Sequence, residues 1–354
     1  MLLRCANGLL AACMMLAVTH SGAQAQDKPL RKINYAISSA VSIGHSHLTS
    51  IPRAMGYFKE EGLDVNILSF PGAEVLNHLA AGEILAADGG TPAAFAANAA
   101  GRRLITVFAS VTGNPYYVSV PESSDIKSLS DFAGKNIGVY NLAAAGLSLL
   151  RGQMLVEGLD PAKVNFIVVP SPAEAVDAIK RNRIAAYHGF DIFYAQMAAL
   201  GVPGRRLKTA TEDLGGLVGM SVTPETLKKE RETLIKLSRA FVKGIVFAKE
   251  NPEAAVRITW QEFPATRPIG MSEEQALAAG LRILSTRHQS IEKIEGLFGN
   301  ATPKQISTVL DVMQRSGMMR KAMTVEEVWS DTLIREANSI DAAKVQEQAR
   351  RWTK

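Results

Sequence analysis

The first half of the chain alternates short runs rich in β-branched residues with alanine-rich stretches, and this alternation restricts the fold most strongly. We predict strands over residues 33–38, 64–70, 84–87, 104–110, 136–140, 164–169 and 184–188. Helices are predicted between them, over residues 47–60, 73–81, 92–100, 145–157, 172–181 and 190–200. Strands that alternate with helices of this length indicate βαβ units, so we expect parallel sheets with ligand contacts at the strand ends.

Two breaks in this alternation indicate how the chain divides. A turn at residues 113–115 precedes a strand-like segment at 116–120, and residues 201–204 precede strand-like pieces at 206–209 and 217–222. We therefore predict an α/β lobe over 28–115, a second lobe over 116–212, and a return of 213–354 to the first lobe. Two crossings between the lobes would form a hinge, which suits closure around a ligand.

From Pro224 onward the pattern is mainly helical, and several helix starts carry recognisable caps. A side-chain oxygen followed by proline, or by Glu or Gln three residues later, satisfies the free N–H groups of a first helical turn. Such signals occur at Thr223-Pro224, Asn251-Pro252, Ser272 with Gln275, Thr302-Pro303, and Thr324 with Glu327.

Length and charge exclude some functions. At 354 residues the chain is long enough for two domains, each with its own core. Its 39 Lys+Arg against 34 Asp+Glu give a net charge of +5, but the basic pairs are far apart in the sequence. A nucleic-acid-binding stripe is therefore not expected.

The N-terminus carries an export signal. Arg4 precedes an apolar run over residues 8–18, and Ala23 and Ala25 form a small-residue cleavage site. Residues 10–13 also resemble the lipobox of bacterial lipoproteins, which would attach lipid to Cys13. The apolar run continues past Cys13 and ends near Ala25, so we predict a signal peptide over residues 1–25 and a periplasmic protein rather than a lipid anchor.

The positions of the cysteines limit the chemistry that the exported protein could perform. The chain has two cysteines, Cys5 and Cys13, and both lie in the predicted signal peptide. The exported chain would therefore contain none, which excludes thiolate catalysis, iron–sulfur clusters and zinc–cysteine sites.

Several segments carry a family resemblance. Residues 55–65 read MGYFKEEGLDV, and further matching segments follow in order at 69–73, 89–92, 126–139 and 157–160. In this order the chain resembles the periplasmic solute-binding proteins of ABC importers, of the nitrate, taurine, alkanesulfonate and thiamine-precursor type. The resemblance implies a two-lobed α/β fold, the type II periplasmic-binding-protein fold, with a hinge and a helical C-terminal part. It also implies a monomer that works with an ABC permease and an ATPase and needs no cofactor.

The resemblance further places the ligand-binding loops, in a cleft between the lobes. They contain Ser38, Ser39, Ser42, His45, Gly72, Ala73, Gly90, Thr91, Thr112, Tyr140, Asn141, Ala144, Ala145, Phe190 and Asp191. We expect each loop to open a helix, whose free N–H groups and positive dipole end favour an anion. A small organic anion is therefore the expected ligand: a sulfonate, a carboxylate or a pyrimidine-type molecule.

Aromatic residues gather around the loops of the second lobe, and an aromatic-lined pocket would suit a larger or flatter ligand than nitrate or taurine. They are Tyr140, Tyr187, His188, Phe190, Phe193 and Tyr194. The alternative is that most of them are core residues that pack their own helix or strand, most of all Phe193 and Tyr194.

Three other functions compete with solute import. His45, His47, His78 and His188 could hold a metal, but H-x-H alone is a weak zinc signal and we predict no metal site. Enzymes share this fold, yet no nucleophile elbow, Walker loop or dinucleotide fingerprint opens a helix here, and we expect no catalysis. A binding component for a sensor or chemoreceptor remains an open alternative.

Overall fold

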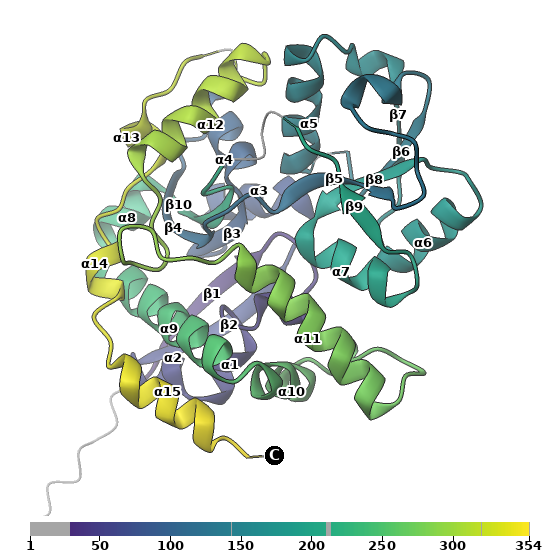
Figure 1. Ribbon diagram of the computed structural model, residues 1–354. Coiled ribbons are helices and arrows are strands. Elements are labelled where there is room, and N and C mark those ends of the chain that lie inside the picture. The colour runs from purple at the N-terminus through teal and green to yellow at the C-terminus, as the bar shows by residue number, and fades with distance from the viewer. Residues whose placement is uncertain (1–28, 143, 210–213, 320, 354) are drawn as a thin grey trace, which may run out of the picture.

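The computed structural model describes residues 29–142, 144–209, 214–319 and 321–353. These residues form two five-stranded sheets, and Figure 1 shows each sheet with its own helices. Sheet A has the order β2-β1-β3-β10-β4. Its strands are β1 (Arg31–Ile37), β2 (Leu63–Ser69), β3 (Ala86–Gly90), β4 (Ile105–Val111) and β10 (Val218–Val222).

Sheet B contains the middle of the chain in the order β7-β6-β8-β5-β9. Its strands are β5 (Tyr116–Pro121), β6 (Asn136–Val139), β7 (Asn165–Val168), β8 (Ala186–Phe190) and β9 (Gly204–Arg206). The chain passes to sheet B between β4 and β5 and returns to sheet A between β9 and β10. The lobe boundaries at 115/116 and 212/213 stay a prediction.

The expectation of parallel sheets is wrong in one respect, because both sheets are mixed. β1 pairs in parallel with β2 and β3, but β10 runs antiparallel between β3 and β4. In sheet B, β5 runs antiparallel to both β8 and β9. β5 and β10 are the strands that follow the two crossings without a preceding βα unit, so nothing forces them into a right-handed parallel connection.

Helices cover the sheets as the alternation predicts. With sheet A lie α1 (Ser50–Ala54), α2 (Tyr57–Glu60), α3 (Val75–Ala80) and α4 (Thr91–Ala99), and with sheet B lie α5 (Ala145–Val156), α6 (Pro172–Lys180) and α7 (Asp191–Ala199). One predicted helix, 47–60, is broken into α1 and α2 at Gly56, whose φ of 75° is left-handed. Short 3-10 turns occur at η1 (Ile43–His45), η2 (Gly72–Glu74), η3 (Leu129–Phe132), η4 (Pro161–Lys163) and η5 (Pro264–Thr266).

The second half of the chain is helical, as predicted. It contains α8 (Pro224–Lys229), α9 (Arg231–Glu250), α10 (Pro252–Glu262), α11 (Glu273–Gln289), α12 (Pro303–Arg315), α13 (Val325–Val328), α14 (Ile334–Ala337) and α15 (Ala342–Arg351). All the predicted starts are confirmed: Thr223, Asn251, Ser272, Thr302 and Thr324 are the N-cap residues of α8, α10, α11, α12 and α13.

The helices after the return to sheet A also contact those of sheet B. α11 packs against α7 and α12 against α5, while α4 also contacts α5. Figure 1 shows α11 crossing in front of the molecule beside α7. These contacts hold the carboxyl ends of the two sheets toward each other.

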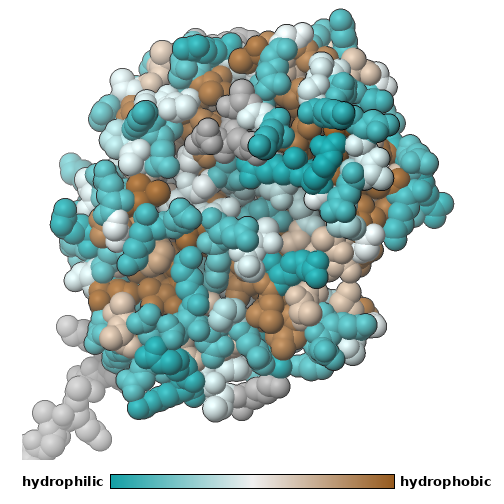
Figure 2. All heavy atoms as spheres, in the orientation of Figure 1, coloured by the Kyte–Doolittle hydropathy of each residue, from teal (hydrophilic) through white to brown (hydrophobic). Residues whose placement is uncertain are grey.

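Buried side chains fill the space between sheets and helices. Phe241 of α9 packs against Tyr35 and Phe108 in an aromatic cluster. Figure 2 shows the face of Figure 1 as mostly hydrophilic, with hydrophobic residues in scattered patches. Among the helices of the described residues, none combines the length and apolar character required to span a bilayer.

Candidate functional site

A pocket opens where strand ends from both sheets meet. Sheet A supplies residues at the ends of β1, β3 and β4, and sheet B supplies the end of β8 and the residue after β6. The pocket encloses about 900 Å³ of space free of protein atoms, its open mouth included. This placement follows the rule that α/β sheets bind ligands beyond the carboxyl ends of their strands.

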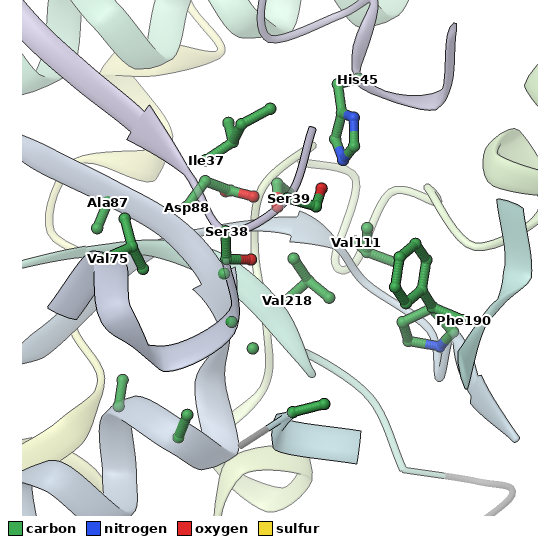
Figure 3. Close-up of a pocket in the computed structure, with 18 of the residues that line it drawn as sticks. Ile37, Ser38, Ser39, His45, Val75, Ala87, Asp88, Val111, Phe190 and Val218 are labelled. Atoms are coloured by element: carbon green, nitrogen blue, oxygen red, sulfur yellow. The ribbon is translucent and has the colours of Figure 1, made fainter. Parts of the chain in front are cut away.

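Nine of the fifteen predicted site residues line this pocket. They are Ser38, Ser39, His45, Gly72, Ala73, Gly90, Tyr140, Ala144 and Phe190. Figure 3 shows Ser38 and Ser39 beside Asp88, with His45 above them and Phe190 on the opposite side. The structure therefore brings most of the predicted loops to one pocket, and their role in ligand binding stays a prediction.

Thr112 does not line this pocket. Its loop joins β4 to β5 and opens no helix, contrary to our expectation for every loop. The Thr112 hydroxyl donates to the Ser290 carbonyl at 3.2 Å and accepts from the Glu292 N–H at 2.9 Å. These two hydrogen bonds connect the β4–β5 loop to the residues that follow α11.

Ser42 and Thr91 also lie outside the lining. Ser42 caps η1, with its hydroxyl 3.1 Å from the His45 Nδ1. The buried Thr91 hydroxyl donates to the Gly216 carbonyl at 2.8 Å. Both hydroxyls therefore hold loops in place instead of facing the cavity.

The remaining predicted residues lie at the edge of the lining. The Asn141 amide lies beside Gly72, where an added Cβ would come within 3.0 Å of Nδ2. Ala145 opens α5 directly after the lining residue Ala144. Asp191 is buried at the start of α7, where its Oδ1 accepts the Ile192 N–H at 2.8 Å and pairs with the Arg287 guanidinium at 2.7 Å.

Asp88 and Arg287 are lining residues that our sequence analysis missed. Asp88 lies in β3, only 4 % exposed, and its Oδ2 finds no hydrogen-bond partner among the described residues. Burial raises the pKa of the Asp88 carboxyl to about 7, against the opposing effects of the nearby Ser110 hydroxyl and the Arg287 guanidinium. An acidic residue at the end of an apolar strand, before Gly89 and Gly90, was the available signal.

Arg287 reaches the pocket from α11, far along the chain from the other lining residues. Its Nη2 contacts Asp191, whereas its Nε has no hydrogen-bond acceptor among the described residues. No local pattern around residue 287 indicates this role, because it depends on how α11 packs against α7.

The histidines at the pocket are neutral. Burial and the Arg287 charge lower the pKa of His45 to about 3, and burial with the neighbouring His288 and Arg287 charges lowers the pKa of His47 as well. Among the described residues no cluster of three or more His, Cys, Asp and Glu is arranged to hold a metal. His45 and His47 can therefore act as uncharged hydrogen-bonding groups.

Aromatic residues divide between pocket and core. The Tyr140 and Phe190 rings meet edge to face at 5.7 Å between centroids and both line the pocket, as does Tyr116. The core interpretation holds for Tyr194, whose hydroxyl binds the Gly189 N–H at 2.6 Å, and for Tyr187, whose hydroxyl donates to the Val169 carbonyl at 3.0 Å. Phe193 packs in the same core.

Comparison with known proteins agrees with this architecture. The family model described as NMT1/THI5 like matches residues 51–255. The chain belongs to this family. It is 24% identical over 342 residues to the formylaminopyrimidine-binding protein of Halalkalibacterium halodurans, covering 91% of this chain and 96% of the relative.

Solved structures share the fold of this NMT1/THI5-like protein. The alkanesulfonate-binding protein SsuA from Xanthomonas axonopodis pv. citri, bound to MOPS, superimposes with a TM-score of 0.63 at 17% identity over 86% of this chain and 99% of that one. The nitrate-binding protein NrtA from Synechocystis PCC 6803 gives 0.63 at 16% identity over 90% and 91%. The predicted type II periplasmic-binding-protein fold is thereby confirmed.

Proposed function

We propose that this protein is the solute-binding component of an ABC import system and captures one small organic solute in the pocket between sheets A and B. The observation that carries the proposal is the pocket itself, which lies between strand ends of both sheets and is lined by hydroxyl groups, histidines and three aromatic rings. Few polar groups in a largely apolar concave site are typical of small-molecule binding. The names of the formylaminopyrimidine-, alkanesulfonate- and nitrate-binding relatives support the same function.

Closure of the two lobes forms part of this proposal. The chain crosses between the sheets twice, between β4 and β5 and between β9 and β10, and these crossings would form the hinge. One lobe would contain residues 28–115 and 213–354, and the other would contain residues 116–212. Closure would bring Tyr140 and Phe190 of sheet B onto a solute held by Ser38 and Ser39 of sheet A.

Binding without catalysis is the second part of the proposal. The Ser42 and His45 side chains lie 3.1 Å apart, but this pair caps η1 and Ser42 does not line the pocket, so it presents no nucleophile. Both cysteines of the chain belong to the predicted signal peptide over 1–25, which lies outside the described residues. Export through that signal would place the protein in the periplasm.

A thermal-shift panel tests the binding function directly. The panel contains aromatic and aliphatic carboxylates, sulfonates and pyrimidines. A true ligand at a hundredfold excess over its Kd should stabilise the folded protein by about 2.7 kcal/mol. No stabilisation by any member of the panel would contradict the proposal.

The alternative role in sensing uses the same pocket. Solute uptake by cells that lack this gene separates the two roles, since loss of uptake supports import. Unchanged uptake with a lost behavioural response to the solute would instead support a sensor or chemoreceptor partner.

A further inference from the structure

We propose that Asp88 sets the ligand class of this pocket: its carboxylate accepts hydrogen bonds from N–H groups of the solute, so the site selects flat amidine- or amine-bearing rings over sulfonates and carboxylates. The inference rests on the proposed function, because it concerns the same pocket. It narrows our expectation of a sulfonate, a carboxylate or a pyrimidine-type molecule, which came from the resemblance and from the helix N-termini.

The first argument is the unmet hydrogen-bonding capacity of Asp88. The residue is 4 % exposed, it lines the pocket, and its Oδ2 has no hydrogen-bond partner among the described residues. Figure 3 shows its carboxyl group directed toward Ser39. A buried carboxylate oxygen without a donor costs free energy, and a solute N–H group directed at Oδ2 would remove that cost.

The second argument is that the positive charge at the pocket is already paired. The Arg287 Nη2 lies 2.7 Å from the Asp191 Oδ1, and both side chains are nearly fully buried, at 5 % and 4 % exposed. An incoming sulfonate would meet a guanidinium whose charge Asp191 already balances, together with the second carboxyl group, that of Asp88. The net charge of these three groups, with both carboxyls ionised, opposes an anion.

The third argument concerns the helix N-termini. In the described part of the chain, the N-cap residues of α4, α5 and α7 line the pocket, namely Gly90, Ala144 and Phe190. The Asp191 carboxylate already occupies the N-terminus of α7. At α4 the Thr91 N–H donates to the Leu217 carbonyl at 3.0 Å, and Pro92 has no N–H. Two of the first backbone N–H positions of α4 are therefore unavailable to an anion.

The remaining groups favour a flat ring. Tyr140 and Phe190 supply aromatic surface at the pocket wall, where a planar solute can stack. The Arg287 Nε–H, also without a partner among the described residues, can donate to a ring nitrogen of the same solute. An amino-substituted nitrogen ring offers the donor that Asp88 requires and the acceptor that Arg287 Nε requires.

Matched probes test the inference by calorimetric titration at pH 8.5, where Asp88 is ionised. Benzamidinium and benzoate share one planar skeleton but present N–H donors or anionic oxygens, and 4-aminopyrimidine is a neutral donor. The wild-type protein should bind the donor probes about tenfold or more tightly than benzoate. Asp88→Asn should weaken the donor probes by about 10- to 100-fold and leave benzoate unchanged or improved.

Asp64→Asn is the matched control, since it removes the same charge at an exposed position of β2 and should change nothing. A preference of the wild-type protein for benzoate, or donor affinities within about twofold of wild type in Asp88→Asn, would overturn the inference while leaving the proposed function intact. Failure of every carboxylate, sulfonate and nitrogen-ring probe would overturn both. If Asp88→Asn does not fold by circular dichroism, the wild-type preference between benzamidinium and benzoate decides alone.

Discussion

At the scale of single residues, Asp88 combines three properties that seldom occur together: it is acidic, almost fully buried and without a partner at Oδ2 among the described residues. Burial raises the pKa of this carboxyl to about 7, because desolvation outweighs the opposing effects of the Ser110 hydroxyl and the Arg287 charge. The raised value has a consequence for stability that does not depend on any ligand.

Asp88 should make the ligand-free protein less stable as the pH rises. The unfolded carboxyl has a pKa near its ordinary value of about 3.9, so between about pH 4 and 7 the folded state binds more protons than the unfolded state. The free energy of unfolding contributed by this group is therefore highest below about pH 4 and falls by up to about 4 kcal/mol as the pH passes through 7.

Urea unfolding of wild-type protein and Asp88→Asn from pH 4 to 8.5 measures this effect. Because Asn does not titrate, the variant should gain stability relative to wild type across that range and then reach a plateau. A difference between the two proteins that stays constant from pH 4 to 8.5 would contradict the raised pKa.

The sequence predicts the backbone of the site better than its charged groups. Ser38, Gly72, Gly90 and Phe190 lie in loops that the βα pattern locates, and all four line the pocket. Arg287 could not be predicted, because its position depends on tertiary packing of a helix from the other half of the chain.

At the scale of elements, α11 and α7 join the two halves of the molecule. Arg287 lies near the end of α11 and Asp191 is the first residue of α7, so their buried ion pair links a helix of the C-terminal part with a helix of sheet B. Removing one partner would leave the other charge buried and uncompensated, which is among the costliest single changes in a core.

Arg287→Met should therefore reduce the free energy of unfolding by about 3–5 kcal/mol, measured by urea titration. The double variant Arg287→Met with Asp191→Leu should recover much of this loss, because both charges are then gone. Arg181→Met is the control: Arg181 lies 2.7 Å from Asp177, both side chains are exposed, and the loss of this pair should cost far less stability. Equal costs for the two single variants would contradict the coupling of α11 to α7.

Elements that depend on local signals were predicted well. The caps at Thr223, Asn251, Ser272, Thr302 and Thr324 start helices as expected, since a cap acts within one turn. The antiparallel directions of β5 and β10 were not predicted, because strand direction depends on the path of the chain between the sheets.

At the scale of the whole molecule, two sheets with separate helices meet at one pocket, and the chain crosses between them twice. One cluster of buried side chains contains residues of both sheets, among them Tyr35 of β1 and Tyr187 of β8, whereas a smaller cluster belongs to sheet B alone. Under the proposed closure, a solute that contacts residues of both sheets would shift the molecule toward the closed arrangement by its higher affinity for that state.

Native mass spectrometry of the protein with the probe that stabilises it most tests the central claim, that this pocket holds one solute and does not transform it. The account predicts a complex of one solute per chain, and recovery of the solute unchanged in mass after release. Absence of a complex, or recovery of the solute as a product of different mass, would contradict it.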